Sequence, residues 1–344
     1  MQYSVSEISQ ESVWEEFVQN RPEANFLQSW TWGEFQTALH KKVWHIALVS
    51  QLDNAIVGCA LVVKEVAKRG TYFTIAGGPL LDWQAANAGD QFSTLMTEIK
   101  SLAHAEGAGF IRLRPQALDT VEMRQLMQRS GLVESPMHVT ADLTIRLDIT
   151  QTPDEILAQM RKSTRYEIRR CEKLGITVRM SEDADEIRQF YDHQLELAQK
   201  HGFVPFGYDF LYEQFRAFVA KKQVALFHSY QDGQLLASAF IIFYNREAVY
   251  HYGISTPENQ KLPGSYACQW AAILEAQNRG CTHYNFWGIA PADQPQHRFA
   301  GVTLFKQGFG GAETAYVPAF DLPISITYWP TRMFELARKK ARKL

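Results

Sequence analysis

The hydrophobic positions of the chain follow the same pattern twice. Residues 45–63 and 223–244 each contain two apolar runs, rich in β-branched and aromatic residues, on either side of a short polar turn. This pattern is typical of a β-hairpin. A helix-like pattern precedes each hairpin, and another strand, a long amphipathic helix that ends at glycine and a last strand follow it. The repeat predicts an internal duplication.

The order helix, hairpin, strand, helix and strand, present twice, predicts two mixed α/β domains. The offset of about 175 residues between the halves matches the usual size of one domain. Each domain is expected to hold a twisted, mostly antiparallel sheet flanked by helices. We expect a boundary near residues 147–151, because Thr152, Pro153 and Glu155 form a helix-start signature. The helix that begins there is expected to continue to about Leu174.

Composition narrows the class of protein. With 344 residues, 46% of them hydrophobic and 21% charged, the chain is typical of a globular protein of two domains. The four cysteines form no C-x-x-C pair and the ten histidines show no metal-binding spacing, so neither a metal nor a disulfide scaffold is expected. The first residues do not resemble a signal peptide, and the longest apolar run is about half of a membrane-spanning helix. We therefore expect a cytoplasmic protein.

Two basic segments interrupt an otherwise acidic chain. The net charge is −2, and residues 331–344 contribute +5 (six Lys or Arg against one Glu), so the first 330 residues carry −7. Residues 160–173 hold six cations and two anions. Basic segments of this kind favour partners that carry phosphate. The alternative is an ordinary solvated helix surface.

If each basic segment is helical, its charged and apolar residues fall on particular faces of the helix. In a helix, Arg161, Arg165 and Arg169 fall on one stripe, and a row of guanidinium groups is suited to hold phosphates. Along residues 327–344, apolar side chains gather on one face and cations on the other, which is typical of an interfacial helix at anionic lipid headgroups. Such a helix would contact the inner face of the cell membrane. The alternative is a helix that packs its apolar side on the first domain.

A single lysine lies within the apolar and glycine-rich segment GVTLFKQGFGG, residues 301–311. Lys306 is flanked there by Phe305 and Phe309. It is either a surface residue whose stem packs on apolar neighbours or a charge held where a reaction needs one.

Six segments, in their order along the chain, resemble the FemABX aminoacyltransferases, which build the interpeptide bridges of peptidoglycan. They are FLQSWTWGEF (26–35), GGPLLD (77–82), MRKSTRYEIRRCEKLGITV (160–178), LPGSYACQWAAI (262–273), HYNFWGI (283–289) and LFKQGFGG (304–311). The chain has no counterpart of the long helical arm of some members, so it resembles the short, armless type.

The resemblance implies a fold and an activity. The fold would be two tandem acetyltransferase-like (GNAT-type) domains, with the end of the chain returning to the first: residues 1–148 plus 318–344, and residues 149–317. The protein would transfer an amino acid from aminoacyl-tRNA to an amine on the stem peptide of a peptidoglycan precursor, without a cofactor. The arginine stripe would then hold the tRNA acceptor arm or the pyrophosphate of the precursor.

The resemblance also implies a site. Lys306 matches the family's lysine that stabilises the oxyanion, and Tyr266 matches a tyrosine of the second-domain site. Gly264 and Ser265 would offer backbone N–H groups at a helix N-terminus. The expected substrate-binding residues are Trp32, Gln36, Phe206, Gly264, Ser265, Tyr266 and Phe305.

Three positions depart from the family pattern. Gln36 and Phe206 replace a lysine and an arginine that bind the acceptor's phosphates in members using a soluble nucleotide, which favours a lipid-linked acceptor. Arg114 replaces an aspartate once considered a base, which is tolerable if the reaction needs no protein base. Two alternatives stay open: an N-acyltransferase that uses acyl-CoA or a carrier-protein thioester on a cell-envelope amine, and a non-catalytic protein that binds tRNA or the precursor.

Overall fold

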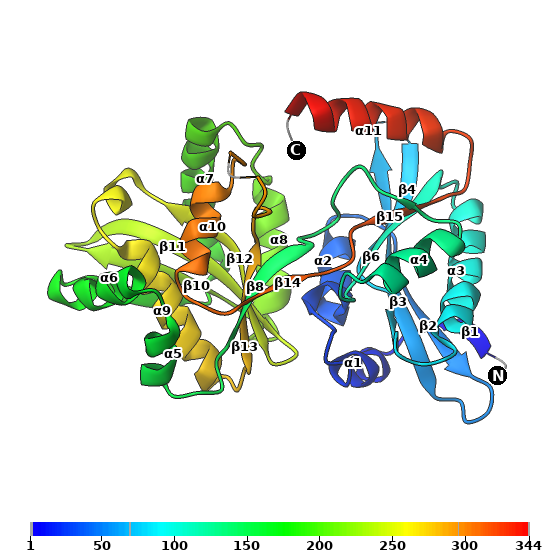
Figure 1. Ribbon diagram of the computed structural model, residues 1–344, viewed down its shortest axis with the longest axis horizontal. Coiled ribbons are helices and arrows are strands. Elements are labelled where there is room, and N and C mark those ends of the chain that lie inside the picture. The colour runs from blue at the N-terminus through cyan, green and yellow to red at the C-terminus, as the bar shows by residue number, and fades with distance from the viewer. Residues whose placement is uncertain (1–2, 69, 295, 343–344) are drawn as a thin grey trace. The chain divides into compact units, whose positions relative to one another are not determined.

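The computed structural model describes residues 3–68, 70–294 and 296–342 of the chain (Figure 1). The chain divides into two compact units. The first unit comprises residues 1–142 and 315–344, and the second comprises residues 143–314. Each unit is built around one mixed sheet.

The sheet of the first unit has the strand order β1-β2-β3-β4-β6-β15-β7, with β5 paired to β3. Its strands are β1 (Tyr3–Glu7), β2 (Val43–Ser50), β3 (Ile56–Ala67), β4 (Gly70–Gly77), β5 (Leu80–Leu81), β6 (Phe110–Pro115), β7 (Val133–Glu134) and β15 (Phe320–Pro323). Strands β4 and β6 run parallel, and β15 pairs antiparallel with both β6 and β7. The hairpin predicted over residues 45–63 is confirmed as β2 and β3.

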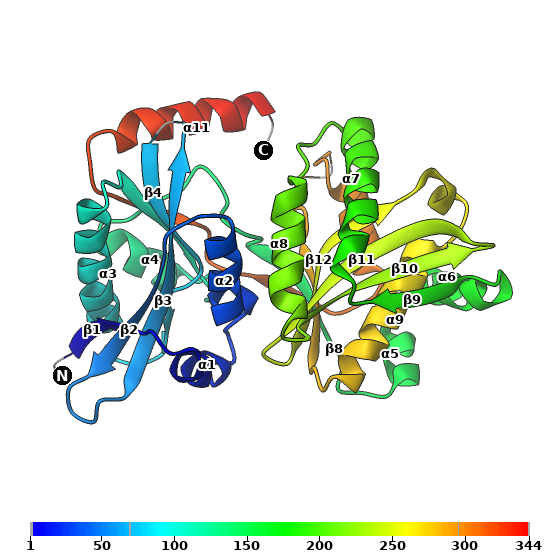
Figure 2. The same cartoon turned by 180° about the vertical axis from the view of Figure 1, so that it is seen from behind.

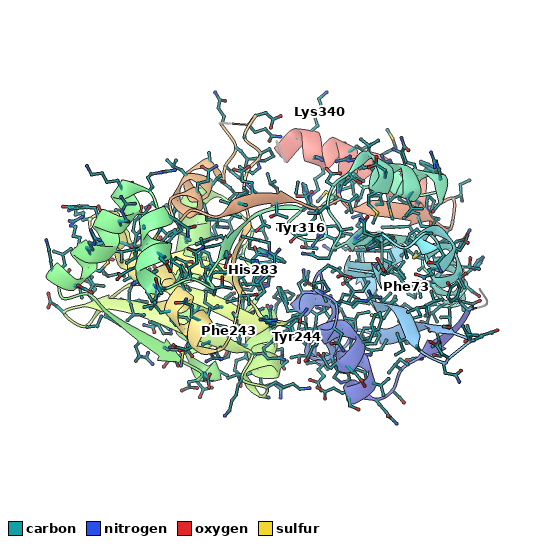
Figure 3. All side chains as sticks on the ribbon, turned by 60° about the horizontal axis from the view of Figure 1, so that its bottom comes forward. Phe73, Phe243, Tyr244, His283, Tyr316 and Lys340 are labelled. Carbon is teal, nitrogen blue, oxygen red and sulfur yellow. The ribbon has the colours of Figure 1, made fainter. Side chains whose placement is uncertain are left out.

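Helices cover both faces of this sheet. The helices of this unit are α1 (Glu11–Gln19), α2 (Trp30–Ala38), α3 (Ala88–Ala105), α4 (Val121–Arg129) and α11 (Tyr328–Arg342), with a short 3-10 turn over Phe26–Gln28. Alternate strand residues such as Phe73, labelled in Figure 3, pack with α3 and α4 in the core. In the middle of β3 the residues between them are buried as well, and α2 packs on β2 and β3. Burial on both faces explains why the strands are nearly continuously apolar.

The sheet of the second unit has the strand order β14-β8-β13-β12-β11-β10-β9. Its strands are β8 (Leu143–Asp148), β9 (Thr177–Ser181), β10 (Val224–Gln231), β11 (Gln234–Tyr244), β12 (Glu247–Ser255), β13 (His283–Gly288) and β14 (Ala312–Ala315). The second predicted hairpin is confirmed as β10 and β11. Phe243 of β11 lies in the core of this unit (Figure 3).

Six α-helices among the described residues of the second unit flank its sheet. They are α5 (Pro153–Gln159), α6 (Lys162–Lys173), α7 (Ile187–His201), α8 (Tyr208–Val219), α9 (Gly264–Asn278) and α10 (Ala300–Gln307), with 3-10 turns over Ala184–Glu186 and Pro257–Gln260, the former continuing into α7. Helix α9 packs on β10, β11 and β12, and α6 packs on α9. Helices α7 and α8 lie side by side, as Figure 2 shows.

The predicted duplication is visible in the strand orders. Read from β9 to β14, the second sheet repeats the first, and in both sheets the fourth and fifth strands run parallel. The next strand in each sheet comes from a different part of the chain. Strand β15 follows β14 in sequence but completes the first sheet, and β8 follows β7 but joins the second. Residues 143–148 thus lie in the second sheet, because Ile145 and Leu147 are buried in its core.

The helix predicted over residues 153–174 is interrupted. Its start is confirmed, because Thr152 and Glu155 form a reciprocal capping box. The chain leaves the helix at Met160 and Arg161, whose backbone is extended, and resumes as α6. Two contacts favour this break: Met160 is buried, and the Arg161 amide donates to the carbonyl of Gly308 at 2.9 Å. The predicted single helix is therefore wrong in this detail.

In the described ranges, none of the helices has both the length and the apolar character required to cross a membrane.

Candidate active site

Helix α10 carries Lys306 in its last turn. The hydroxyl of Thr303 accepts a hydrogen bond from the Ala290 amide at 2.8 Å, which fixes the helix to the segment after β13. After the helix the chain turns through Gly310 and Gly311, whose φ angles are 84° and 87°. A Cβ atom at Gly311 would lie 2.6 Å from the carbonyl oxygen of Arg146. Glycine is therefore required at position 311, both for the backbone angle and for space.

Lys306 is buried, with 7% of its surface exposed. Its Nζ donates to the carbonyl oxygen of Gly288 at 2.7 Å and lies 5.6 Å from the ring centroid of Tyr250. No carboxylate among the described residues forms an ion pair with it. Burial lowers the pKa of Lys306 from 10.5 to about 7, because an apolar environment disfavours the charged amine. This lysine can exchange a proton near neutral pH.

The carbonyl that receives Lys306 belongs to a β-bulge. The pairing of β13 with β8 shifts between Asn285 and Gly288, and Trp287 has a positive φ of 60°. The Thr144 hydroxyl donates to Asn285 Oδ1 and lies 3.0 Å from the Trp287 carbonyl oxygen. The Trp287 amide donates to the same Asn285 oxygen at 2.8 Å. Bulges of this kind redirect groups beside functional sites.

Thr144 and Asn285 are site residues that the sequence analysis missed. Asn285 is fully buried, and its amide nitrogen donates to Glu247 Oε2 at 3.2 Å. A buried amide in an apolar strand is costly unless every polar atom is bonded. The asparagine in the otherwise apolar segment HYNFWG was the available signal.

Tyr266, Phe305 and Phe309 form an aromatic cluster, in which Phe305 is the neighbour of Lys306 in sequence. Tyr266 lies in the first turn of α9, and its ring centroid is 5.0 Å from that of Phe305 and 5.8 Å from that of Phe309. The phenol hydroxyl makes no hydrogen bond with any residue that the structure describes. Its pKa is raised, mainly by burial and further by Glu167, while Arg161 lowers it. The structure thus brings together two of the predicted residues, Tyr266 and Phe305. The Tyr266 hydroxyl is available to donate a hydrogen bond to a substrate.

The start of α9 uses its glycine and serine structurally. A Cβ atom at Gly264 would lie 2.5 Å from the Leu236 side chain, so only glycine fits against β11. The Ser265 amide donates to Asn259 Oδ1 at 2.9 Å, and the Asn259 amide nitrogen donates to the serine hydroxyl at 3.0 Å. The sequence analysis assigned the backbone N–H of Ser265 to a ligand. In the structure this N–H is already bonded to Asn259.

The three arginines of the basic segment have different surroundings. Arg161 and Arg169 are exposed, and neither guanidinium forms a hydrogen bond or ion pair with a described residue. Arg165 instead donates to the carbonyl oxygens of Ala158 and Met160, at 2.9 and 2.6 Å. It thereby caps the end of α5. Two cations remain free to meet a phosphate, and the third holds the break between α5 and α6.

The remaining predicted residues belong to other elements of the two units. Trp32 and Gln36 belong to α2 of the first unit, where Trp32 packs edge-on against Phe26 at 5.5 Å. Gln36 is buried, and its Oε1 has no hydrogen-bond partner among the described residues. Phe206 precedes α8 in the second unit, is 45% exposed and stacks on Phe210 at 4.8 Å.

The described ranges also contain potential metal ligands and cysteine thiols. They contain no cluster of three His, Cys, Asp or Glu side chains that could hold a metal ion. All four cysteines are buried, and burial raises the pKa of Cys171 to about 11 and that of Cys268 to about 12. Such thiols are poor nucleophiles at neutral pH.

The two tandem sheets with flanking helices agree with the similarities of the chain to known proteins. The FemAB family matches residues 9–130, 131–227 and 213–335, so the chain belongs to the FemAB family. Aminoacyltransferase FemA of Staphylococcus aureus is 37% identical over 93 residues, which are 27% of this chain and 22% of FemA. The match thus spans about a fifth of that relative's length.

Solved structures define the fold. The crystal structure of FemX has a TM-score of 0.83 at 17% identity, covering 97% of this chain and all of that one. A tandem GNAT protein from the clavulanic acid pathway has a TM-score of 0.57 at 8% identity, with coverages of 94% and 99%. L-PGS from Bacillus licheniformis has a TM-score of 0.58 at 17% identity and 97% coverage of both chains. The predicted tandem, GNAT-like fold is confirmed.

Proposed function

We propose that this protein is an aminoacyltransferase that moves an amino acid from aminoacyl-tRNA to an amine on the stem peptide of a peptidoglycan precursor. The FemAB membership and the FemA relative, an aminoacyltransferase by name, support the reaction class. The observation that carries the proposal is the buried Lys306, which donates to a backbone carbonyl and meets no carboxylate among the described residues. Burying an amine without an opposite charge is costly, so a function must maintain it.

The reaction joins an amine to an ester carbonyl. The acceptor nitrogen attacks the ester carbon of aminoacyl-tRNA, a C–N bond forms, and negative charge develops on the carbonyl oxygen. The C–O bond to the ribose then breaks, and the ribose oxygen takes up the proton that the amine loses. Such a reaction requires fixed donors at the developing oxyanion and correct placement of two substrates.

Lys306 supplies the donor in this scheme. Its charged form donates a hydrogen bond to the oxyanion, as it donates to Gly288 at 2.7 Å in the structure. Because burial lowers the lysine pKa to about 7, the same amine can also pass a proton toward the leaving ribose. Tyr266 lies in the aromatic cluster next to the lysine's helix, and its free hydroxyl is a second donor.

Arg161 and Arg169 serve as phosphate contacts for the tRNA acceptor arm. Both are exposed, without partners among the described residues, and lie in the basic segment, so they can neutralise phosphates without losing an internal contact. Arg165 has a structural role and is not part of this contact.

A lipid-linked precursor is the favoured acceptor. The positions of Gln36, buried on α2, and Phe206, exposed beside Phe210, carry no charge to bind the pyrophosphate of a soluble nucleotide. The thioester alternative is supported by the likeness to a tandem GNAT protein. The two functions differ in their donor, so acyl-CoA and charged tRNA can be compared directly.

The proposal is tested by incubating the purified protein with a pool of charged tRNAs and muropeptide acceptors, in parallel with acyl-CoA, and reading the products by mass spectrometry. We expect an acceptor mass increased by one aminoacyl residue only where charged tRNA is present. Product from acyl-CoA alone would replace the proposal by the thioester reaction, and binding of tRNA without product would indicate a non-catalytic protein.

A further inference from the structure

Helix α11 packs its polar side against the rest of the first unit. Glu335 forms an ion pair with Arg112 of β6 at 2.7 Å, and Arg112 also pairs with the buried Asp321 of β15. The Tyr328 hydroxyl donates to Asp321 Oδ2 at 3.1 Å, and Arg332 donates to the Glu134 carbonyl oxygen at 2.6 Å. The helix is thus held by charged and hydrogen-bonded groups.

The apolar side chains of the same helix face away from these contacts. Ile326 just before the helix is 84% exposed, and Met333 is 66% exposed. Trp329 and Leu336 are exposed as well. The spacings of four and three residues place Trp329, Met333 and Leu336 along one side of the helix, and Ile326 precedes it. These four side chains are here named the apolar stripe. The alternative that α11 packs its apolar side on the first domain is therefore wrong.

An exposed apolar stripe on a firmly anchored helix needs an explanation. Folding normally buries the apolar side of an amphipathic helix and leaves its charges in water. Here the ion pairs of Glu335 and the buried phenol of Tyr328 fix the opposite orientation. Exposed apolar patches on folded proteins mark surfaces that bind another phase or another molecule.

Cations follow the apolar stripe along the helix. The segment 336–342 contains Arg338, Lys339, Lys340 and Arg342 and no acidic residue. Lys340 is exposed and projects from α11 in Figure 3. No carboxylate among the described residues pairs with Arg338, Lys339 or Lys340. The surface is therefore apolar along one side and positively charged at one end.

We propose that the apolar stripe and the cations Arg338, Lys339 and Lys340 form a binding surface for membranes that contain anionic phospholipids. A helix lying in the membrane interface buries a shallow row of apolar side chains, with tryptophan at headgroup level and cations beside the phosphates. The stripe offers Trp329 and three aliphatic or thioether side chains in that arrangement. The charge selects an anionic bilayer over an uncharged protein partner.

The proposed membrane surface contains none of the residues assigned to amino-acid transfer. An experiment can therefore disprove membrane binding without disproving transfer, and the reverse. If the acceptor is lipid-linked, this surface would bring the enzyme to it. Activity on a water-soluble muropeptide should not depend on α11.

The test is co-sedimentation of the purified protein with vesicles, either of phosphatidylcholine alone or with about one third phosphatidylglycerol. We expect binding to the anionic vesicles that weakens with added salt, and little binding to the neutral ones. The double variant Trp329→Ser/Met333→Ser should lower the partition coefficient by about tenfold or more. Lys340→Gln should lower it by about fivefold, the effect of one cation near an anionic surface.

Matched controls lie elsewhere on the first unit. Leu52, which is 89% exposed, and Lys100 of α3, which is also exposed, provide Leu52→Ser and Lys100→Gln, and both variants should bind like the wild type. All substituted side chains are exposed, and circular dichroism spectra should show that the variants are folded. Failure of the wild type to bind anionic vesicles would overturn the proposal, as would equal binding by the double variant. A concentration-dependent dimer that is lost in the double variant, without vesicle binding, would assign the stripe to a second copy of the chain.

Discussion

The buried lysine should make the protein less stable at neutral pH than a variant without it. Burial lowers the pKa of Lys306 from 10.5 to about 7. At 1.36 kcal/mol per pH unit, this difference corresponds to about 5 kcal/mol, because the unfolded chain protonates the amine more readily. Between pH 7 and pH 10.5 the unfolded state binds more protons, so the contribution of Lys306 to stability rises with pH.

Lys306→Met removes this cost and introduces a smaller one. Methionine has a similar length and no charge, but it leaves the Gly288 carbonyl without its donor, which costs about 1–3 kcal/mol. We therefore expect the variant to be more stable than the wild type by about 2–4 kcal/mol near pH 6. Above pH 10.5, where the wild-type amine is neutral in both states, the variant should be less stable by about 1–3 kcal/mol.

The assay is urea unfolding of both proteins across this pH range. Other titrating groups, including the buried tyrosines whose pKa values are raised, affect both proteins alike and cancel in the difference. Lys162→Met, at an exposed lysine of α6, is the matched control and should show no pH-dependent difference. A difference for Lys306→Met that stays constant with pH would refute the lowered pKa of this buried amine.

Two further predictions concern the backbone and the basic segment. Gly311→Ala should lower the free energy of unfolding by at least about 2 kcal/mol, because its Cβ would meet the Arg146 carbonyl, whereas Gly175→Ala, with positive φ but open space, should cost only about 1–2 kcal/mol in denaturant unfolding. Equal costs would contradict the close packing at Gly311. The double variant Arg161→Gln/Arg169→Gln should weaken tRNA binding and reduce the salt slope of log K by about 1.4–2, measured by filter binding, while Arg165→Gln should mainly lower stability. A larger binding loss in Arg165→Gln would reverse this assignment.

The sequence predicts the architecture because its signals are local and repeated. Both hairpins have β-branched runs around short turns, and the capping residues at Thr152 and Glu155 act within one helical turn. The break between α5 and α6 is different in kind. It depends on the burial of Met160 and on a hydrogen bond from Arg161 to Gly308, which lies far away in sequence. Periodicity carries no information about such a contact.

The site can be predicted only in part from the sequence, because it too depends on contacts between residues that are far apart along the chain. Lys306 is conspicuous as a cation in an apolar segment, but its burial against Gly288 depends on a bulge held by Thr144 from another strand. The orientation of α11 also cannot be read from its pattern, since amphipathicity alone predicts that the apolar side is packed. The orientation is fixed by the ion pair between Glu335 and Arg112, which are 223 residues apart.

The most direct test of the proposed chemistry is the single-turnover rate of amino-acid transfer from charged tRNA to a muropeptide acceptor, compared between wild type, Lys306→Met and Lys100→Met. Loss of one oxyanion donor should slow Lys306→Met by about 10²-fold or more, although that variant is expected to be the more stable protein near neutral pH. Lys100→Met, at an exposed lysine of α3, should react at the wild-type rate. Transfer by Lys306→Met as fast as by the wild type would contradict the role assigned to this lysine.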